Sequence, residues 1–370
     1  MESPLLQSSG AVPADAPDQE VAAHYGEPAQ EQRALASGTA FVDRGNRGVV
    51  RVSGPDRLSW LHSLLSQHLD GLKPFEPTEA LLLGPNGHIE HHLFLIDDGE
   101  AVWAHVEPGT APALVEFLDR MRFMLRVEVA DVSAEYTVLT VPETPATPAD
   151  AAAPGNAAAP GNVAAPADAA APGDAAVPGD AAAPGGLAWP DVAGTVTRIV
   201  PRADVPGPLT EGLRPAGIWA YEALRIAEHR PRLGLDTDHR TIPHEAGYVE
   251  TAVHLNKGCY RGQETVARVH NLGRPPRRLV FLHLDGSVDR LPAPGAPVDL
   301  PDGGRTVGFV GSSARHHELG PIALALVKRN VPVDAELLAD GVAAAQEVVV
   351  SPETGANAQI DLRRRPVKHG

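Results

Sequence analysis

Cysteine is nearly absent from this chain of 370 residues, which contains only Cys259. A single cysteine excludes an intrachain disulfide. It also excludes an iron-sulfur cluster held by this chain alone, because such a cluster needs about four thiolate ligands. We therefore expect no resident iron-sulfur cluster. We also expect a reducing compartment, in which one free thiol is tolerated.

Basic residues are also scarce, with 31 Lys and Arg against 47 Asp and Glu, so that the net charge is -16. A general nucleic-acid-binding protein needs a basic excess for its phosphate contacts, so this class is excluded. Long apolar runs are missing too: no window approaches the roughly 18 apolar residues of a membrane span, and the first twenty residues do not resemble a signal peptide. We expect a cytoplasmic protein without a membrane partner.

A biased segment interrupts the middle of the chain. Six hexapeptides, AAAPGN, AAAPGN, VAAPAD, AAAPGD, AAVPGD and AAAPGG, run from Ala151 to Gly186. They lack the large aliphatic residue that a hexapeptide β-helix stacks in every turn. Proline blocks a helix and alanine buries little surface, so the composition predicts an extended linker.

The remaining segments alternate between helical and strand patterns. Residues 48–53 and 79–83 favour strands, and Leu58, Leu61 and Leu65 recur at helical spacing between them. Residues 88–96 favour a further strand across a Gly-Pro-Asn-Gly turn. From Leu279 onward, short apolar runs separated by Gly, Pro and Asp are typical of a small β-barrel. The regular βαβ alternation of a Rossmann sheet is missing, so the class is α+β.

The most informative segment is NKGCYRGQETVARVHNLG at residues 256–273. Gly258 and Gly262 bracket three residues, which predicts a tight loop with open backbone amides. Between residues 257 and 278 there are six basic residues and one acid, Glu264, against the sign of the whole chain. Such a run could hold an anion, or it could be a solvated face. Both interpretations remain open.

The lone cysteine has two interpretations as well. Lys257 and Arg261 flank Cys259, and nearby positive charge favours the thiolate, so this residue could be reactive. A lone cysteine is otherwise most often a small buried core residue. Clustered histidines at 88, 91 and 92 could bind zinc, but His91 and His92 would face opposite sides of a strand, so we predict no metal site.

KGCYRGQE at residues 257–264 resembles the signature of the YgfZ family, which is close to K-G-C-Y-x-G-Q-E. Residues 51–69, 222–247 and 304–329 resemble segments of the related aminomethyltransferases. The resemblance implies an aminomethyltransferase-like fold of three parts around a central cavity, with a C-terminal β-barrel. It implies tetrahydrofolate or a derivative as the cofactor. It also implies a link to iron-sulfur protein maturation and to tRNA-modifying enzymes.

The resemblance also assigns site residues. It implies that Cys259 is the catalytic group, as a transient thiolate. Arg and Lys can pair with the carboxylates of a folate tail. The expected folate-binding residues are Lys257, Gly258, Tyr260, Arg261, Gly262, Gln263, Glu264, Arg268, Arg277 and Glu228.

The expected organisation has six segments. They are a disordered N-terminus (1–30), an N-terminal α+β folate-binding region (31–145), the linker (146–188), the second half of the folate-binding region with the KGCYRGQE loop (189–275), the β-barrel (276–350) and a tail (351–370).

Two departures from the aminomethyltransferases bear on catalysis. Those enzymes place a catalytic aspartate just after a G-x-I strand, where residues 87–92 of this chain offer His91 or His92. They place a pterin-contacting glutamate in an R-L-E-A-G-like helix, where this chain has Ala227, with Glu228 one position later. We therefore expect a folate-binding accessory protein of iron-sulfur assembly or repair, not an enzyme, whose partners are iron-sulfur proteins or assembly factors.

Two alternatives compete with this expectation. One is a tetrahydrofolate-dependent aminomethyl or one-carbon transferase, in which Glu90, His91 or Glu228 serves as acid or base. The other is a non-catalytic scaffold. A carboxylate in the cavity favours the enzyme, a solvent-facing Cys259 at the cavity rim favours the accessory protein, and a closed cavity favours the scaffold.

Overall fold

The computed structural model describes residues 2–143, 187–301 and 305–355. Apart from residues 187 and 188, the expected linker lies outside the described residues, and so does the tail beyond residue 355.

The first part is a five-stranded sheet with the order β5-β6-β7-β4-β8. Apolar side chains on one face form its core with two helices, in which Leu61 and Leu114 are fully buried. The strands at 48–53, 79–83 and 88–96 are thus confirmed to within a residue, as is the helix after the first of them. The bounds are β4 (Gly48–Ser53), α2 (Arg57–Leu64), β5 (Thr78–Leu83), β6 (Ile89–Asp97), β7 (Ala101–Val106), α3 (Ala111–Met121) and β8 (Glu128–Asp131).

The second part is another five-stranded sheet, with the order β10-β11-β9-β3-β12. Only β12 runs parallel to its neighbour β3 among the pairs of this sheet. Leu35 and Leu224 pack together from two helices beside it. The bounds are α1 (Pro28–Ala36), β3 (Ala40–Asp43), β9 (Tyr136–Pro142), β10 (Ala188–Pro190), β11 (Thr195–Pro201), α4 (Gly207–Thr210), β12 (Arg214–Ala216) and α5 (Ile218–Ala227).

The third part is a closed barrel with the strand order β13-β16-β15-β14-β17-β18. Alternate residues such as Val280 and Leu282 fill its interior, because successive side chains of a strand point to opposite faces. The predicted C-terminal barrel is confirmed. The bounds are β13 (Arg277–Leu284), β14 (Pro297–Asp299), β15 (Thr306–His316), β16 (Gly320–Lys328), β17 (Leu337–Ala339) and β18 (Val342–Val348).

The N-terminal segment corrects one expectation. Residues 2–30 are ordered, with a 3-10 helix (Pro4–Gln7) and the strands β1 (Val12–Pro13) and β2 (Ala22–His24). Leu5, Val21 and Ala23 are buried, and Asp18 pairs with Arg232. The segment docks through a few scattered apolar residues and one buried carboxylate. Such sparse anchors leave no periodic pattern in the sequence.

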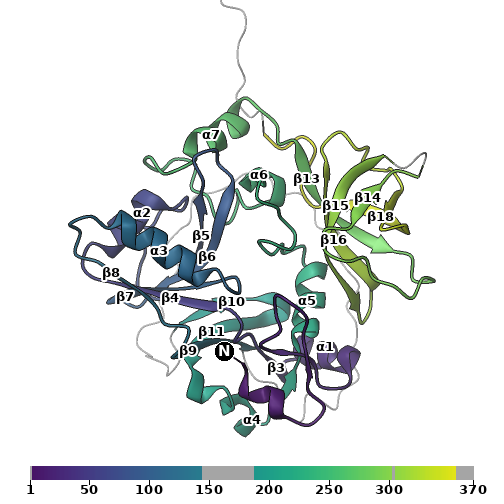
Figure 1. Cartoon of the computed structure of the whole chain (residues 1–370), viewed down its shortest axis with the longest axis horizontal. Coiled ribbons are helices and arrows are strands. Elements are labelled where there is room, and N and C mark those ends of the chain that lie inside the picture. The colour runs from purple at the N-terminus through teal and green to yellow at the C-terminus, as the bar shows by residue number, and fades with distance from the viewer. Residues whose placement is uncertain (1, 144–186, 302–304, 356–370) are drawn as a thin grey trace, which may run out of the picture.

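The three parts surround the centre of the molecule, with the first sheet, the second sheet and the barrel each on a different side (Figure 1). The short helix α6 (Pro243–Ala246) lies near the centre, and α7 (Gln263–Asn271) lies at the periphery. In the described part of the chain, no helix is long and apolar enough to cross a membrane.

Candidate functional site

A cavity of 420 Å³ lies between the three parts. This size is in the range of small-molecule sites. The first sheet, the loop after α5, the segment after α6 and the end of the barrel all contribute side chains to it. The lining residues with polar or aromatic groups include Arg44, Arg47, Glu79, His92, Phe94, Glu107, Tyr221, Arg225, His229, Arg230, Arg232, His244, Tyr248, Glu250 and Thr251.

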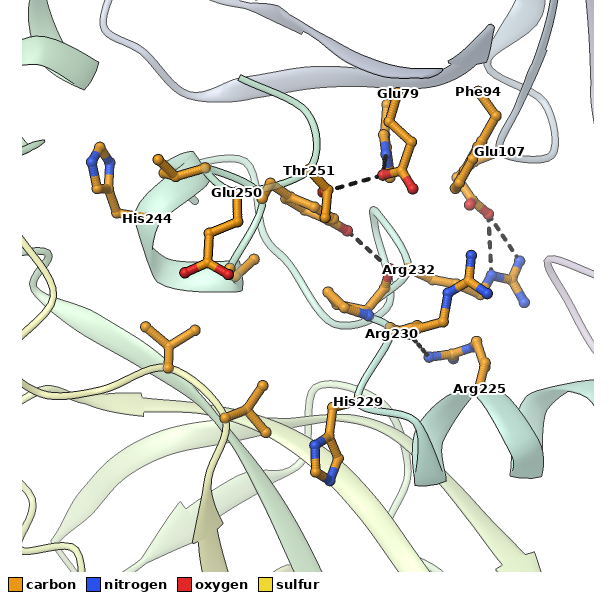
Figure 2. Close-up of a pocket in the computed structure, with 18 of the residues that line it drawn as sticks. Glu79, Phe94, Glu107, Arg225, His229, Arg230, Arg232, His244, Glu250 and Thr251 are labelled. Atoms are coloured by element: carbon orange, nitrogen blue, oxygen red, sulfur yellow. Dashed lines mark hydrogen bonds and ion pairs between the residues drawn. The ribbon is translucent and has the colours of Figure 1, made fainter. Parts of the chain in front are cut away.

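An acid-base pair lies on the sheet side of the cavity. His92 Nε2 and Glu79 Oε2 are 3.0 Å apart, and Thr251 Oγ1 donates to the same carboxylate (Figure 2). Burial alone would raise the pKa of Glu79, but the hydrogen bond and charge of His92 hold it below its ordinary value. The His92 ring lies 4.5 Å from Phe94 and 4.7 Å from Tyr248, centroid to centroid. These contacts fix the position of the imidazole. Glu79 contacts Nε2, so Nδ1 is the ring nitrogen that Glu79 does not hold.

The buried Asp191 binds two guanidinium groups on an adjacent side of the cavity. Asp191 accepts from Arg44 Nη1 at 2.9 Å and from Arg230 Nη1 at 2.8 Å. Tyr221 donates its hydroxyl to the same carboxylate, and the Arg44 guanidinium lies 3.9 Å from the Tyr221 ring centroid. Of the two arginines that pair with Asp191, Arg230 is the more exposed, at 32% of its side chain.

A continuous ion-pair network closes the cavity toward the N-terminal segment. Arg232 pairs with Glu107 at 3.1 Å, with Asp18 at 2.9 Å and with Glu222 at 2.9 Å. Arg225 extends the network to Glu222 and to Asp236. Figure 2 shows this arginine-rich side of the cavity, with His244 and Glu250 away from it.

The charges of this network are held ionised. Burial would raise the pKa of Glu107, but Arg47 and Arg232 hold it far below its ordinary value. Among the described residues, the buried Nη2 of Arg47 and Nε of Arg225 have no hydrogen-bond partner. Several guanidinium groups and aromatic rings line the cavity, which suits a ligand that combines a ring with anionic groups.

The KGCYRGQE loop lies elsewhere, and none of its eight residues lines this cavity. Lys257 is buried and donates from Nζ to the carbonyl oxygens of His62, Leu65 and Gln67. These carbonyls are at the end of α2, where helical acceptors lack partners within the helix. Burial lowers the pKa of Lys257 to about 8, so the group is still charged at neutral pH. Lys257 therefore stabilises the end of a helix instead of contacting the cavity.

Packing explains further positions of this loop. Tyr260 is buried with Leu83 and Val266. Gly262 has a φ of +81°, and a Cβ there would lie 2.7 Å from the carbonyl oxygen of Gly84. Gln263 donates to the Lys257 carbonyl at 3.4 Å, and Glu264 is exposed in the first turn of α7.

Gly258 and Cys259 are exposed. The cations that flank Cys259 in sequence have other partners, because Arg261 pairs with Glu90 at 2.8 Å and Lys257 binds the end of α2. The structure thus leaves the thiol accessible, outside the cavity lining.

The other expected folate contacts are also absent from the lining. Arg277 is engaged by Asp238 and Glu245, Arg268 is exposed on α7, and Glu228 accepts from the Ala193 amide. The strand alternation expected for the histidines is confirmed: His92 lines the cavity, whereas His91 is buried and its Nδ1 has no hydrogen-bond partner among the residues that the structure describes. No group of three or more possible metal ligands occurs in the described residues.

No signal in the sequence indicates the arginine side of the cavity. Arg230 and Arg232 lie within the segment 222–247, which resembles the aminomethyltransferases. The resemblance indicates this segment, but it does not indicate that these two arginines line the cavity. Arg232 meets Glu107 and Asp18, which are 125 and 214 residues away in sequence. No local pattern connects positions that far apart.

No protein-family model matches the chain. A curated Arabidopsis thaliana protein named "putative transferase, chloroplastic" is 26% identical over 299 residues, which are 78% of this chain and 66% of that protein. This chain thus spans slightly less than two thirds of that relative. The glycine cleavage system aminomethyltransferase T from Bartonella henselae matches with a TM-score of 0.69 and 18% identity, over 93% of this chain and 94% of that chain. This chain has the aminomethyltransferase fold. The predicted fold is confirmed.

Proposed function

We propose that this chain binds a reduced folate in the central cavity and acts as a tetrahydrofolate-dependent one-carbon transferase. The observation that carries the proposal is the His92–Glu79 pair, set in an arginine-rich cavity of an aminomethyltransferase fold. A reduced folate, when bound, would accept or supply a one-carbon unit at its N5 and N10 nitrogens. The name of the plant relative, a transferase, supports the same class of reaction.

The side chains of the cavity have separable tasks under this proposal. Arg230 is partly exposed and pairs with carboxylates of the ligand. Phe94 and Tyr248 offer aromatic faces to a ring. His92, oriented by Glu79, gives or takes a proton through the ring nitrogen that Glu79 does not hold.

By its resemblance, this chain offers His91 or His92 where the aminomethyltransferases place an aspartate after the G-x-I strand, so we expect the acceptor to differ from that of the glycine cleavage enzyme. The carboxylates of Glu79 and Glu107 line the cavity, which favours the enzyme over a vestigial scaffold. Cys259 is exposed, but it is not among the lining residues, so the feature expected of an accessory protein is only half present.

Calorimetric titration with tetrahydrofolate tests where the ligand binds. Arg230→Met should weaken binding by about tenfold or more, because a charge-assisted hydrogen bond contributes about 1.5–3 kcal/mol. Arg268→Met is the matched control on exposed α7 and should leave the affinity unchanged. If only the Arg268 variant loses affinity, the ligand binds near the KGCYRGQE loop and the cavity proposal is wrong.

A second candidate, the iron-sulfur accessory role of YgfZ-like proteins, is favoured by one observation: the exposed Cys259 on a glycine-bracketed loop. We expect Cys259→Ser to leave the melting temperature and tetrahydrofolate binding unchanged, since the thiol is neither buried nor in the cavity. Cells lacking the native protein would be scored for the activity of an iron-sulfur enzyme. Loss of rescue by the serine variant would support the accessory role, and full rescue would refute a role for the thiol.

A further inference from the structure

A second cavity of 460 Å³ lies between the N-terminal segment, the start of α5 and the barrel. Its lining is mainly apolar and includes Pro17, Trp219 and Leu291. Trp219 is 48% exposed, and its ring contacts the ring of His24 at a centroid distance of 5.1 Å, with the two planes tilted by 47°. Exposed tryptophan beside apolar side chains is typical of a ligand site.

The charged groups of this second cavity have one predominant sign. Asp15, Asp18 and Glu222 line it, against a single guanidinium, Arg315. Arg315 pairs with Asp289, which is not a lining residue, at 2.5 Å. Asp15 is exposed, and no side-chain partner of its carboxylate occurs in the described residues.

The two other carboxylates belong to the network that separates this cavity from the central one. The described network has four carboxylates and three guanidinium groups, so one negative charge is left over. Its members are Asp18, Glu107, Glu222, Asp236, Arg47, Arg225 and Arg232. Asp18 and Glu222 line the second cavity, whereas Glu107 and the three guanidinium groups line the central one.

We propose that the second cavity binds an organic ammonium ligand, with its apolar body against Trp219 and its charge toward Asp15 and the excess negative charge of the network. The charge complementarity excludes an anion, because an anion would face three carboxylates. An uncharged apolar ligand would leave Asp15 and the network uncompensated. A cation close to the exposed part of the Trp219 ring also gains a cation–π interaction.

Calorimetric titration with phenethylamine, at neutral pH and without folate, tests the proposal. We expect a dissociation constant of about 1 mM or tighter, a reasonable affinity for a ligand of this size. 2-Phenylethanol has the same shape without the charge and should bind about tenfold more weakly or not at all. Since folate is absent, the result does not depend on the proposed function of the central cavity.

Two variants locate the binding site. Trp219→Leu should weaken phenethylamine binding by about tenfold, and Asp15→Asn by about threefold. The matched controls are Phe123→Leu and Asp334→Asn, both exposed and outside this cavity, and they should bind like the wild type. All four proteins are checked for an unchanged melting temperature. Equal binding of the alcohol, absence of binding at about 10 mM, or wild-type affinity in both cavity variants would overturn the proposal.

Discussion

Side chains of the same charge have different roles in this molecule, and their burial and bonding partners decide which role each has. Lys257 and Arg230 are both cations within segments that resemble a folate-binding family. Lys257 uses its ammonium to bind three backbone carbonyls of the chain. Arg230 keeps part of its guanidinium exposed in the cavity. A signature read from the sequence gives the spacing of residues but not the direction of their side chains, and in the structure the loop lies outside the lining of the central cavity.

His92 provides the residue-scale prediction. Glutamine at this position can keep an amide nitrogen near Glu79 but has no titratable ring, so His92→Gln should abolish proton transfer while the fold is retained. We expect turnover to fall by about 100-fold, the usual contribution of general acid–base catalysis, and tetrahydrofolate affinity to change by less than about threefold. The measurement is consumption of methylene-tetrahydrofolate with thiol and amine acceptors. Unchanged turnover in the variant would remove His92 from the mechanism.

The sequence predicts those helices and strands that have one face buried in the core. β4 and the strands β5 and β6 alternate or run apolar between turn residues, and α2 repeats leucine at helical spacing, so local pattern was sufficient. The N-terminal segment was missed because Asp18 anchors it through a contact with Arg232. An aspartate directly after Pro17, in a stretch that also holds Asp15 and Glu20, looks solvated in sequence. Only the tertiary structure supplies its partner.

Arg277 connects two elements, since it joins the start of β13 to the segment around α6. Its guanidinium pairs with Asp238 and with Glu245, whose side chain is fully buried. Arg277→Met leaves the Glu245 carboxylate buried without a cation and should lower the free energy of unfolding by about 3 kcal/mol. Arg274→Met is the control, because the Arg274–Glu353 pair is exposed and should contribute less than about 1 kcal/mol. Urea denaturation measures both.

The same pair gives a pH dependence. Burial opposes ionisation of Asp238, but the hydrogen bonds from Arg277 hold its pKa far below its ordinary value. A carboxyl group with a lowered pKa in the folded state contributes stability above its unfolded pKa and loses it as the pH falls toward the folded one. The advantage of the wild type over Arg277→Met should therefore begin to fall below about pH 4 and shrink further as the pH drops. An advantage that stays constant down to pH 3 would contradict this assignment.

At the scale of the whole molecule, two cavities of opposite charge lie on either side of the ion-pair network. Arg225 and Arg232 line the central cavity, and their partners Asp18 and Glu222 line the second one. An ammonium group beside these carboxylates weakens their hold on the arginines and adds positive charge near the central cavity. Both effects favour an anion there.

If both proposed sites exist, their ligands should therefore promote each other's binding. We expect saturating phenethylamine to tighten tetrahydrofolate binding by about fivefold, and reciprocity requires tetrahydrofolate to tighten phenethylamine binding by the same factor. Trp219→Leu should reduce the effect in proportion to the amine affinity that it loses, whereas Arg268→Met should keep it. Two calorimetric titrations, each repeated with the other ligand present, measure the factor from both directions. Mutual weakening would show that the two ligands compete for one cavity, and independent binding would show that the ion-pair network transmits nothing.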